Sequence, residues 1–238
     1  KKSMWQSYTT NNQKGTIYLE DKYLKLPKQK ELIQVRLHRP VEGVIRSATI
    51  SARYNESFYV SLLCEVQIAG VPTTNRWLGV AYDPQKLVET SSPVEVQMPL
   101  FRQTRDKMKV AKRKLVIKSK AAQKRKARLE NARNYQKQKR KVMDLYQKQK
   151  LQKEDYLERV SGNLIRNYDY LFVEAVPSEL SSADFQLQDW YKLITKLRYK
   201  AQWYNKTLLF INVNEQLNEP PDKKSMELEK IGKQVIFE

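Results

Sequence analysis

Two short apolar runs in the sequence could place carboxylates together at the end of a sheet. The run Tyr170–Val176, YLFVEAV, holds one acid, Glu174, and the run Trp77–Tyr82, WLGVAY, carries Ala81 at its inward end with Asp83 just beyond. A carboxylate in a buried strand is costly unless it is paired or binds a metal. Two or three such carboxylates can hold a cation pair about 4 Å apart for phosphodiester hydrolysis. Glu174 is therefore either a metal ligand facing the end of Trp77–Tyr82, or an acid that bonds to a neighbour or lies at an exposed strand end.

Asp83 is a poor replacement for an acid at position 81. It shares the strand face of that position, but two residues along a strand correspond to about 6–7 Å. Metal ligation tolerates errors of only about 0.2 Å, and Pro84 restricts local rearrangement of the backbone. The run is therefore an active site, a ruined one or an ordinary core strand, and Asp83 does not supply an acid at position 81.

A block of positive charge occupies the middle of the sequence. Of the net charge of +19, +18 arises between Arg102 and Lys153, where 21 Lys and Arg stand against three acids. Solvated helices usually intersperse Glu with Lys, so this one-sided charge indicates a polyphosphate partner, most simply nucleic acid. The block does not distinguish RNA from DNA. A solvated helical hairpin or a basic ribosomal-type protein would look similar.

The first part of the chain, residues 1–72, predicts short strands with polar outward faces. Two strands are expected around Glu20–Lys22, and a hairpin is expected in Ile45–Val66 with its turn at Asn55–Ser57. Such a pattern is typical of a small β-barrel or sandwich. The turn-rich segment Gly70–Asn75 marks the boundary to the next domain.

The second part, residues 73–238, predicts an α/β domain. Residues 102–166 contain no proline and predict long helices, which form a basic helical insertion. An amphipathic helix is expected at Asp189–Asn205, and the residues after Val213 read as a polar tail containing Pro220 and Pro221. The expected strands are Trp77–Tyr82, Lys86–Thr90, Val94–Gln97, Tyr170–Val176 and Leu208–Val213.

The cysteine and histidine counts narrow the chemistry. One cysteine, Cys64, and one histidine, His38, exclude a disulfide framework and speak against a Cys/His zinc site. No apolar run approaches the roughly 18 residues of a membrane span, and no signal peptide is visible. The sequence therefore predicts a soluble protein in a reducing, cytoplasmic setting, without a membrane partner.

Seven segments follow one another in an order that one protein family shares. They are SYTTNN (Ser7–Asn12), KLPK (Lys25–Lys28), VRLHRPVEGVIRSATIS (Val35–Ser51), LGVAYD, QKRKARLENARN (Gln123–Asn134), NYDYLFVEAV (Asn167–Val176) and WYKLITKLRYKAQWYNKTLLFINV (Trp190–Val213). In this order they resemble TnpB, the transposon-encoded RNA-guided nuclease related to the type V CRISPR effectors. The resemblance implies a mixed α/β architecture. A wedge-like β-barrel module (1–72) would precede a RuvC-like domain of ribonuclease-H fold (73–238) with the basic insertion 102–166.

The chain departs from that family at the nuclease motifs. The Asp of the first motif, Leu-Gly-Ile/Val-Asp, falls on Ala81, whereas the Glu of the second motif falls on Glu174. The zinc ribbon and third catalytic Asp of the family have no counterpart in Asn214–Glu238. The resemblance therefore implies a degenerate site with no zinc and no functional two-metal Mg²⁺ centre. The protein would not be an enzyme, but a nuclease-dead member of the TldR (TnpB-like nuclease-dead repressor) kind.

Such a protein would bind a guide RNA derived from a transposon end. It would recognise a short motif in double-stranded DNA beside its target and form an RNA–DNA heteroduplex there. It would repress transcription by occupying a promoter, in the prokaryotic cytoplasm and at the nucleoid. Whether it acts as a monomer or a dimer stays open.

The residues expected to contact nucleic acid form three groups. A loop is expected to read the DNA motif, because Tyr can pack on a sugar or a thymine methyl while Asn and Gln can read base edges. Its residues are Gln6, Ser7, Tyr8, Thr9, Thr10, Asn11 and Asn12. Arg36, His38 and Arg39, at the end of a strand predicted in Leu32–Pro40, are expected to hold RNA phosphate. The cations expected to flank guide RNA or heteroduplex are Lys112, Arg113, Lys118, Lys120, Lys124, Arg125, Lys126, Arg128 and Arg133.

Two other functions stay open at this point. An active TnpB-type endonuclease could complete its site with acids from an unseen segment. A guide-free basic architectural protein would carry the same charge.

Overall fold

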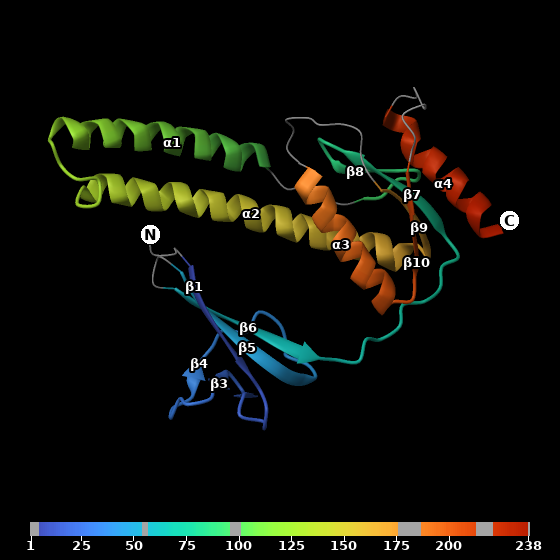
Figure 1. The fold of residues 1–238 in the computed structure, drawn as a ribbon, viewed down its shortest axis with the longest axis horizontal. Coiled ribbons are helices and arrows are strands. Elements are labelled where there is room, and N and C mark those ends of the chain that lie inside the picture. The colour runs from blue at the N-terminus through green and yellow to red at the C-terminus, as the bar shows by residue number, and fades with distance from the viewer. Residues whose placement is uncertain (1–4, 54–56, 96–100, 176–186, 213–220, 238) are drawn as a thin grey trace. The chain divides into compact units, whose positions relative to one another are not determined.

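The computed structural model describes residues 5–53, 57–95, 101–175, 187–212 and 221–237. The chain divides into two compact units, Lys1–Ala69 and Gly70–Glu238. Each unit has a hydrophobic core of its own, and its elements can be followed by colour from blue to red in Figure 1.

The N-terminal unit contains two three-stranded antiparallel sheets. The first has the order β1-β5-β6, and its strands are β1 (Trp5–Asn11), β5 (Val44–Arg53) and β6 (Phe58–Glu65). The second has the order β2-β3-β4, and its strands are β2 (Tyr18–Glu20), β3 (Tyr23–Lys25) and β4 (Ile33–Gln34). The buried core of this unit consists of Ile17, Leu24, Leu26 and Ala48.

The predicted barrel is not observed, which corrects the sequence analysis. In the described part of this unit the two sheets stay separate, and neither closes on itself. Strands β2, β3 and β4 are two or three residues long, too short for the continuous staggered ladder that barrel closure needs. The strand predicted in Leu32–Pro40 likewise ends at Gln34.

The C-terminal unit is built on one four-stranded sheet of order β10-β9-β7-β8. Strands β7 (Trp77–Asp83), β9 (Tyr170–Glu174) and β10 (Thr207–Ile211) run parallel, whereas β8 (Leu87–Thr90) pairs antiparallel with β7. Parallel strands covered on both faces read as continuous apolar runs. This is why the runs in β7 and β9 were identifiable in the sequence.

Helices cover both faces of this sheet. On one face, Leu78, Val80 and Leu171 pack against α2 (Arg133–Asn167) and α3 (Leu187–Trp203). On the other face, Ala81 and Phe172 pack against Leu228 of α4 (Pro221–Phe237). Figure 1 shows α3 and the end of α2 on one side of the strands and α4 on the other.

Two glycines let α4 lie unusually close to the sheet. A Cβ on Gly79 of β7 would overlap the backbone carbonyl of Ser225, and a Cβ on Gly232 would overlap the ring of Phe172. Both contacts bring backbone or ring atoms into the space that a side chain would fill. Helix α4 is therefore an integral layer of the unit, and the predicted polar tail is wrong for residues 221–237.

One further element differs from the prediction. Of the strand expected at Val94–Gln97, Val94 and Glu95 lie in no strand, and Gln97 lies outside the described residues.

The basic segment forms a long antiparallel helical hairpin. Helix α1 (Phe101–Lys124) packs along α2 through a narrow seam that includes Met108, Ala111 and Val142. Polar side chains join the seam: Thr104 Oγ1 donates to Gln152 Oε1 (2.9 Å), and Gln138 Nε2 donates to the Ala111 carbonyl (3.0 Å). The long helices predicted for 102–166 are thus confirmed. Their place as an insertion in a RuvC-like domain stays a prediction. As far as the structure describes them, none of the helices has the length and apolar content of a bilayer-spanning segment.

A buried ion pair ties the start of the sheet together. Asp169, just before β9, accepts hydrogen bonds from the backbone amides of Thr74 (2.6 Å) and Asn75, and it pairs with Lys206 just before β10. The Lys206 side chain is only 3% exposed. Burial opposes ionisation of Asp169, but the hydrogen bonds from Lys206, Asn75 and Thr74 outweigh it and hold the pKa of Asp169 below its usual value.

We expect Asp169→Asn to lower the free energy of unfolding at neutral pH by about 3 to 5 kcal/mol, because it leaves the Lys206 ammonium buried and unpaired. Since the folded-state pKa is depressed, the carboxylate's contribution is complete at neutral pH. It is lost as the pH falls from about 4 through the folded-state pKa. Urea unfolding followed by tryptophan fluorescence measures this, because Trp77, Trp190 and Trp203 all lie in the C-terminal unit.

The matched control is Asp155→Asn, which breaks the exposed pair with Arg159 and should change stability by no more than about 0.5 kcal/mol. A deficit in Asp169→Asn that persisted unchanged at pH 3 would assign the effect to packing instead of charge.

Candidate nucleic-acid interface

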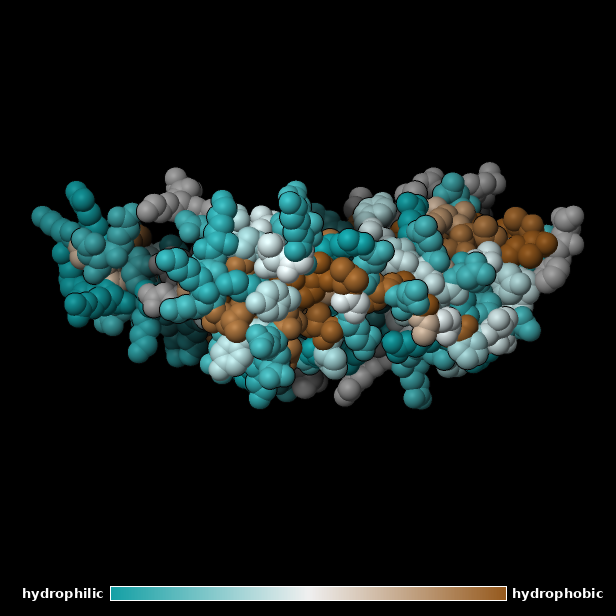
Figure 2. All heavy atoms as spheres, turned by 90° about the horizontal axis from the view of Figure 1, so that it is seen from below, coloured by the Kyte–Doolittle hydropathy of each residue, from teal (hydrophilic) through white to brown (hydrophobic). Residues whose placement is uncertain are grey.

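The predicted cations are distributed over the whole length of the hairpin. Lys112, Arg113, Lys118, Lys120 and Lys124 lie on α1, Arg133 begins α2, and Arg125, Lys126 and Arg128 lie in the turn between them. All are exposed except Lys118, which is half-buried and donates to Gln138 Oε1 at 3.4 Å. Figure 2 shows hydrophilic side chains around the tip of the hairpin, at the left end of that view.

The charges at the tip of the hairpin, which is the turn between α1 and α2, are compensated differently from those at its base, where α2 meets α3. At the base, Lys153 pairs with Asp189 of α3 (2.6 Å), and Glu158 pairs with Lys196 and Lys200 of α3. At the tip, none of Lys124, Lys126 and Arg128 forms an ion pair within the part of the chain that the structure describes. Like charges held this close repel one another unless counterions or phosphates neutralise them. The tip is therefore the part of the hairpin best suited to a polyanion.

Helix α1 carries further exposed cations of the basic block that are not among the predicted contact residues. They are Arg102, Lys107, Lys109 and Lys114. Helical spacing could have found them, because they lie away from the buried positions Thr104, Met108 and Ala111.

The segment predicted as a motif-reading loop is strand β1. Its residues pair with β5 from Gln6↔Ala52 to Asn11↔Ser47. Side chains alternate along a strand, so Ser7, Thr9 and Asn11 lie on one face. Gln6, Tyr8 and Thr10 lie on the face that β5 shares with the core. These six residues cannot all face one ligand surface.

Asn12, directly after β1, stabilises the backbone that follows this strand. Its Nδ2 donates to the carbonyls of Ile17 (2.9 Å) and Ile45 (2.8 Å), and its Oδ1 accepts from the Ile17 amide (3.0 Å). With both its donor and acceptor atoms engaged, Asn12 closes the turn after β1 and has little capacity left for a base edge. Tyr8, by contrast, is 61% exposed.

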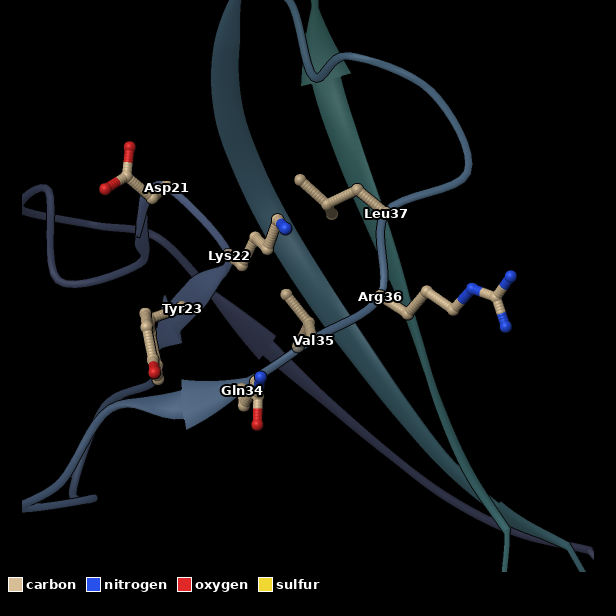
Figure 3. Close-up of a pocket in the computed structure, with 7 residues that line it drawn as sticks. All are labelled: Asp21, Lys22, Tyr23, Gln34, Val35, Arg36 and Leu37. Atoms are coloured by element: carbon tan, nitrogen blue, oxygen red, sulfur yellow. The ribbon is translucent and has the colours of Figure 1, made fainter.

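The residues predicted to hold RNA phosphate lie beyond the end of β4. Arg36, His38 and Arg39 are exposed and belong to no strand, which corrects their predicted place at a strand end. Arg36 lines an open hollow of about 1050 Å³ with Asp21, Lys22, Tyr23, Gln34, Val35 and Leu37 (Figure 3).

Position 81 and Glu174 are neighbours across the central strands. The register Val80↔Val173 places the next residues, Ala81 and Glu174, side by side. Glu174 is 2% exposed, and its Oε2 accepts a hydrogen bond from the Tyr82 amide at 2.8 Å. The carboxylate thus continues the ladder where β9 ends. The sequence analysis had left open whether Glu174 bonds to a neighbour, and it does.

A second acid lies on the other side of Ala81, and the sequence analysis did not consider it. Glu89 of β8 is the cross-strand partner of Ala81. Its Oε1 accepts from Ser225 Oγ of α4 at 3.1 Å, so it points to the face that α4 covers. Glu89 and Glu174 therefore flank position 81 on adjacent strands, with about 10 Å between their Cα atoms.

A two-metal centre does not fit the described residues. None of the residues that the structure describes form a group of three or more His, Cys, Asp or Glu side chains that could hold a metal ion. We therefore assign no reaction step to a metal.

Comparison with known proteins supports an RNA-guided protein. The chain is similar to a Streptomyces pristinaespiralis protein named "Putative RNA-guided DNA endonuclease", with 26% identity over 197 residues, 79% of this chain and 47% of the relative. The chain thus spans about half the length of this relative. No protein-family model matches the chain. The similarity agrees with the predicted TnpB-like resemblance at the level of RNA-guided proteins.

The comparison overturns the prediction that the protein is not an enzyme, because the relative bears the name of an endonuclease. That prediction rests on the absence of a third catalytic Asp in Asn214–Glu238, and on Ala81, with Asp83 too far along the strand to replace an acid at that position. It did not weigh Glu89, which the antiparallel pairing of β8 brings next to that position.

We expect neutralising the hairpin tip to weaken the salt dependence of nucleic-acid binding. In Lys124→Gln with Lys126→Gln, the slope of log affinity against log salt should fall by up to about 1.4 on single strands or 1.8 on duplex DNA. Titrations at several salt concentrations measure the slope. The control, Lys192→Gln with Lys230→Gln, removes two exposed charges from α3 and α4 and should leave it unchanged. Equal slopes for both variants would mean that the tip is only a solvated surface.

Proposed function

We propose that the protein is an RNA-guided DNA-targeting protein of the endonuclease class. A guide RNA would be held largely by the basic hairpin and would direct the protein to complementary DNA next to a short motif. The observation that carries the proposal is the similarity to the RNA-guided DNA endonuclease across most of this chain.

The charge distribution supports this proposal independently. A positive block of +18 concentrated in one hairpin supplies affinity for phosphate that does not depend on base sequence. A protein whose specificity is delegated to base pairing needs this kind of surface, which recognises the geometry and backbone of a heteroduplex.

The N-terminal unit is the better candidate for motif recognition, because its exposed side chains are mostly uncharged. Tyr8 and Gln6 share one face of β1 and are both exposed. Together they combine an aromatic ring with an amide that can pair with a base edge. Motif reading by this face is part of the proposal.

Any cleavage that the protein performs should depend on Glu89 and Glu174, the acids that flank position 81. The first step of the test is to sequence the RNA that co-purifies with the protein, which identifies the guide and hence the target DNA. We expect the guide-loaded protein to cut matched DNA. Glu89→Gln and Glu174→Gln should each abolish the cutting, whereas the exposed control Glu95→Gln should retain it.

Guide-directed binding without cutting would limit the activity to targeting, with promoter occupancy as its only effect. Absence of any defined RNA would refute the proposal in favour of a guide-free basic protein.

We expect only one face of β1, the face that carries Tyr8, to take part in motif recognition. We expect Tyr8→Ala to abolish binding to duplex DNA that carries the motif, while guide RNA and a pre-opened complementary strand still bind, because neither step needs motif reading. Asn11→Ala, on the opposite face, should leave all three unchanged. Paired binding curves on duplex and single-stranded target decide this. Equal losses on both substrates for Tyr8→Ala would show that Tyr8 holds RNA or supports the fold.

A further inference from the structure

The hollow beside β3 and β4 brings together aromatic, amide, cationic, apolar and acidic side chains. Tyr23 and Gln34 are direct cross-strand partners, so their side chains lie next to each other on the same face. Figure 3 shows them side by side at one end of the hollow, with Arg36 reaching out at the other and Lys22, Val35 and Leu37 between. The sequence alone does not suggest this grouping, because the residues come from a tight turn, two short strands and an irregular segment.

This combination matches the parts of a nucleotide. The Tyr23 ring, 44% exposed, offers a face on which a base can stack. The Gln34 amide can donate to and accept from a base edge. The cations Lys22 and Arg36 can reach a phosphate, and Leu37, which is 37% exposed, supplies apolar surface for a sugar.

The charge and size of the hollow favour a polymer over a free small molecule. Its lining carries Lys22 and Arg36 against Asp21, and the exposed Arg39 follows Arg36 by three residues. Its volume of about 1050 Å³ lies just above the roughly 300–1,000 Å³ of small-ligand pockets. It is also open to solvent. A flexible strand that leaves one unpaired base in the hollow and continues past it fits these features.

We propose that this hollow binds an unstacked nucleotide of single-stranded RNA, with the base on Tyr23 and Gln34 and a flanking phosphate on Lys22 and Arg36. The inference rests on the proposed function, because the strand would be an unpaired part of the guide RNA.

The test uses the full chain and an oligouridylate of about 12 nucleotides as the probe. Tyr23→Ala should lower affinity by at least about fivefold, the lower limit of what one stacked base contributes. Tyr23→Phe, which keeps the ring, should restore it. Because no charge is removed, the salt slope of Tyr23→Ala should stay that of the wild type. Arg36→Gln should instead lower the slope by about 0.7.

The matched control is Tyr18→Ala. Tyr18 lies on the adjacent strand β2 and is 45% exposed, so it tests the loss of a surface tyrosine from the same sheet. If Tyr23→Ala fails to fold, photo-crosslinking of 4-thiouridine-containing probe to the wild-type protein, mapped by mass spectrometry, should mark Tyr23 and not Tyr18.

Three results would overturn the inference. The first is that Tyr23→Ala binds the probe with wild-type affinity, and the second is that Tyr18→Ala loses as much affinity as Tyr23→Ala. The third is that polyglutamate displaces the probe as readily as RNA does, which would indicate a site for acidic peptides. If a defined guide RNA co-purifies with the wild-type protein but the variants bind the probe normally, this inference is refuted and the proposed function is not. A wild-type protein that recovers no defined RNA would remove the proposed function.

Discussion

The concentration of positive charge in one hairpin is the constraint around which the C-terminal unit is arranged. Twenty-one cations against three acids would drive two isolated helices apart, so the hairpin must be anchored where charge can be balanced. The base of α2 supplies this anchor. Tyr156, Leu157 and Leu164 are buried against the sheet, and Glu158 draws Lys196 and Lys200 of α3 into ion pairs. With the base fixed in this way, the tip can remain uncompensated and available to a polyanion.

The extent to which the fold could be predicted follows from how each element is stabilised. Strands β7 and β9 and helix α3 bury apolar side chains at regular spacing, so the sequence identified them. Strand β1 is polar, and it is stabilised by pairing with β5 some forty residues away, which no local pattern records. The sequence predicts a polar tail containing Pro220 and Pro221 where the structure has helix α4. Pro221 is in fact its first residue, where a missing amide hydrogen costs nothing.

The candidate site likewise has a part that the sequence alone reveals and a part that depends on which strands pair. Composition alone identified the basic block, since a charge excess of this size needs no tertiary information. Glu89 could not be predicted from the sequence, because its position beside Ala81 depends on the pairing of β8 with β7. Its hydrogen bond also comes from a distant residue, Ser225, 136 residues away. The neighbours Tyr23 and Gln34 are likewise joined only by the register of β3 with β4. Local sequence patterns predict the secondary structure and burial of a residue, whereas the cross-strand register decides which residues lie next to each other.

The two kinds of surface on this chain have different capacities, and the difference bears on how specificity could arise. Contacts from the hairpin cations to phosphate do not depend on sequence, so these contacts supply affinity and no discrimination. In the N-terminal unit, Tyr8 and Gln6 on β1 and Tyr23 and Gln34 in the hollow are side chains able to read a base. Each base pair read directly contributes about 1–3 kcal/mol of discrimination, so a handful of such residues can select only a short motif. A protein that must find a long target with this inventory needs sequence information from outside the polypeptide, and a base-paired guide supplies it without further side chains. The proposed function fits this division, because a protein whose specificity comes from base pairing needs mainly residues that hold the backbone of the heteroduplex.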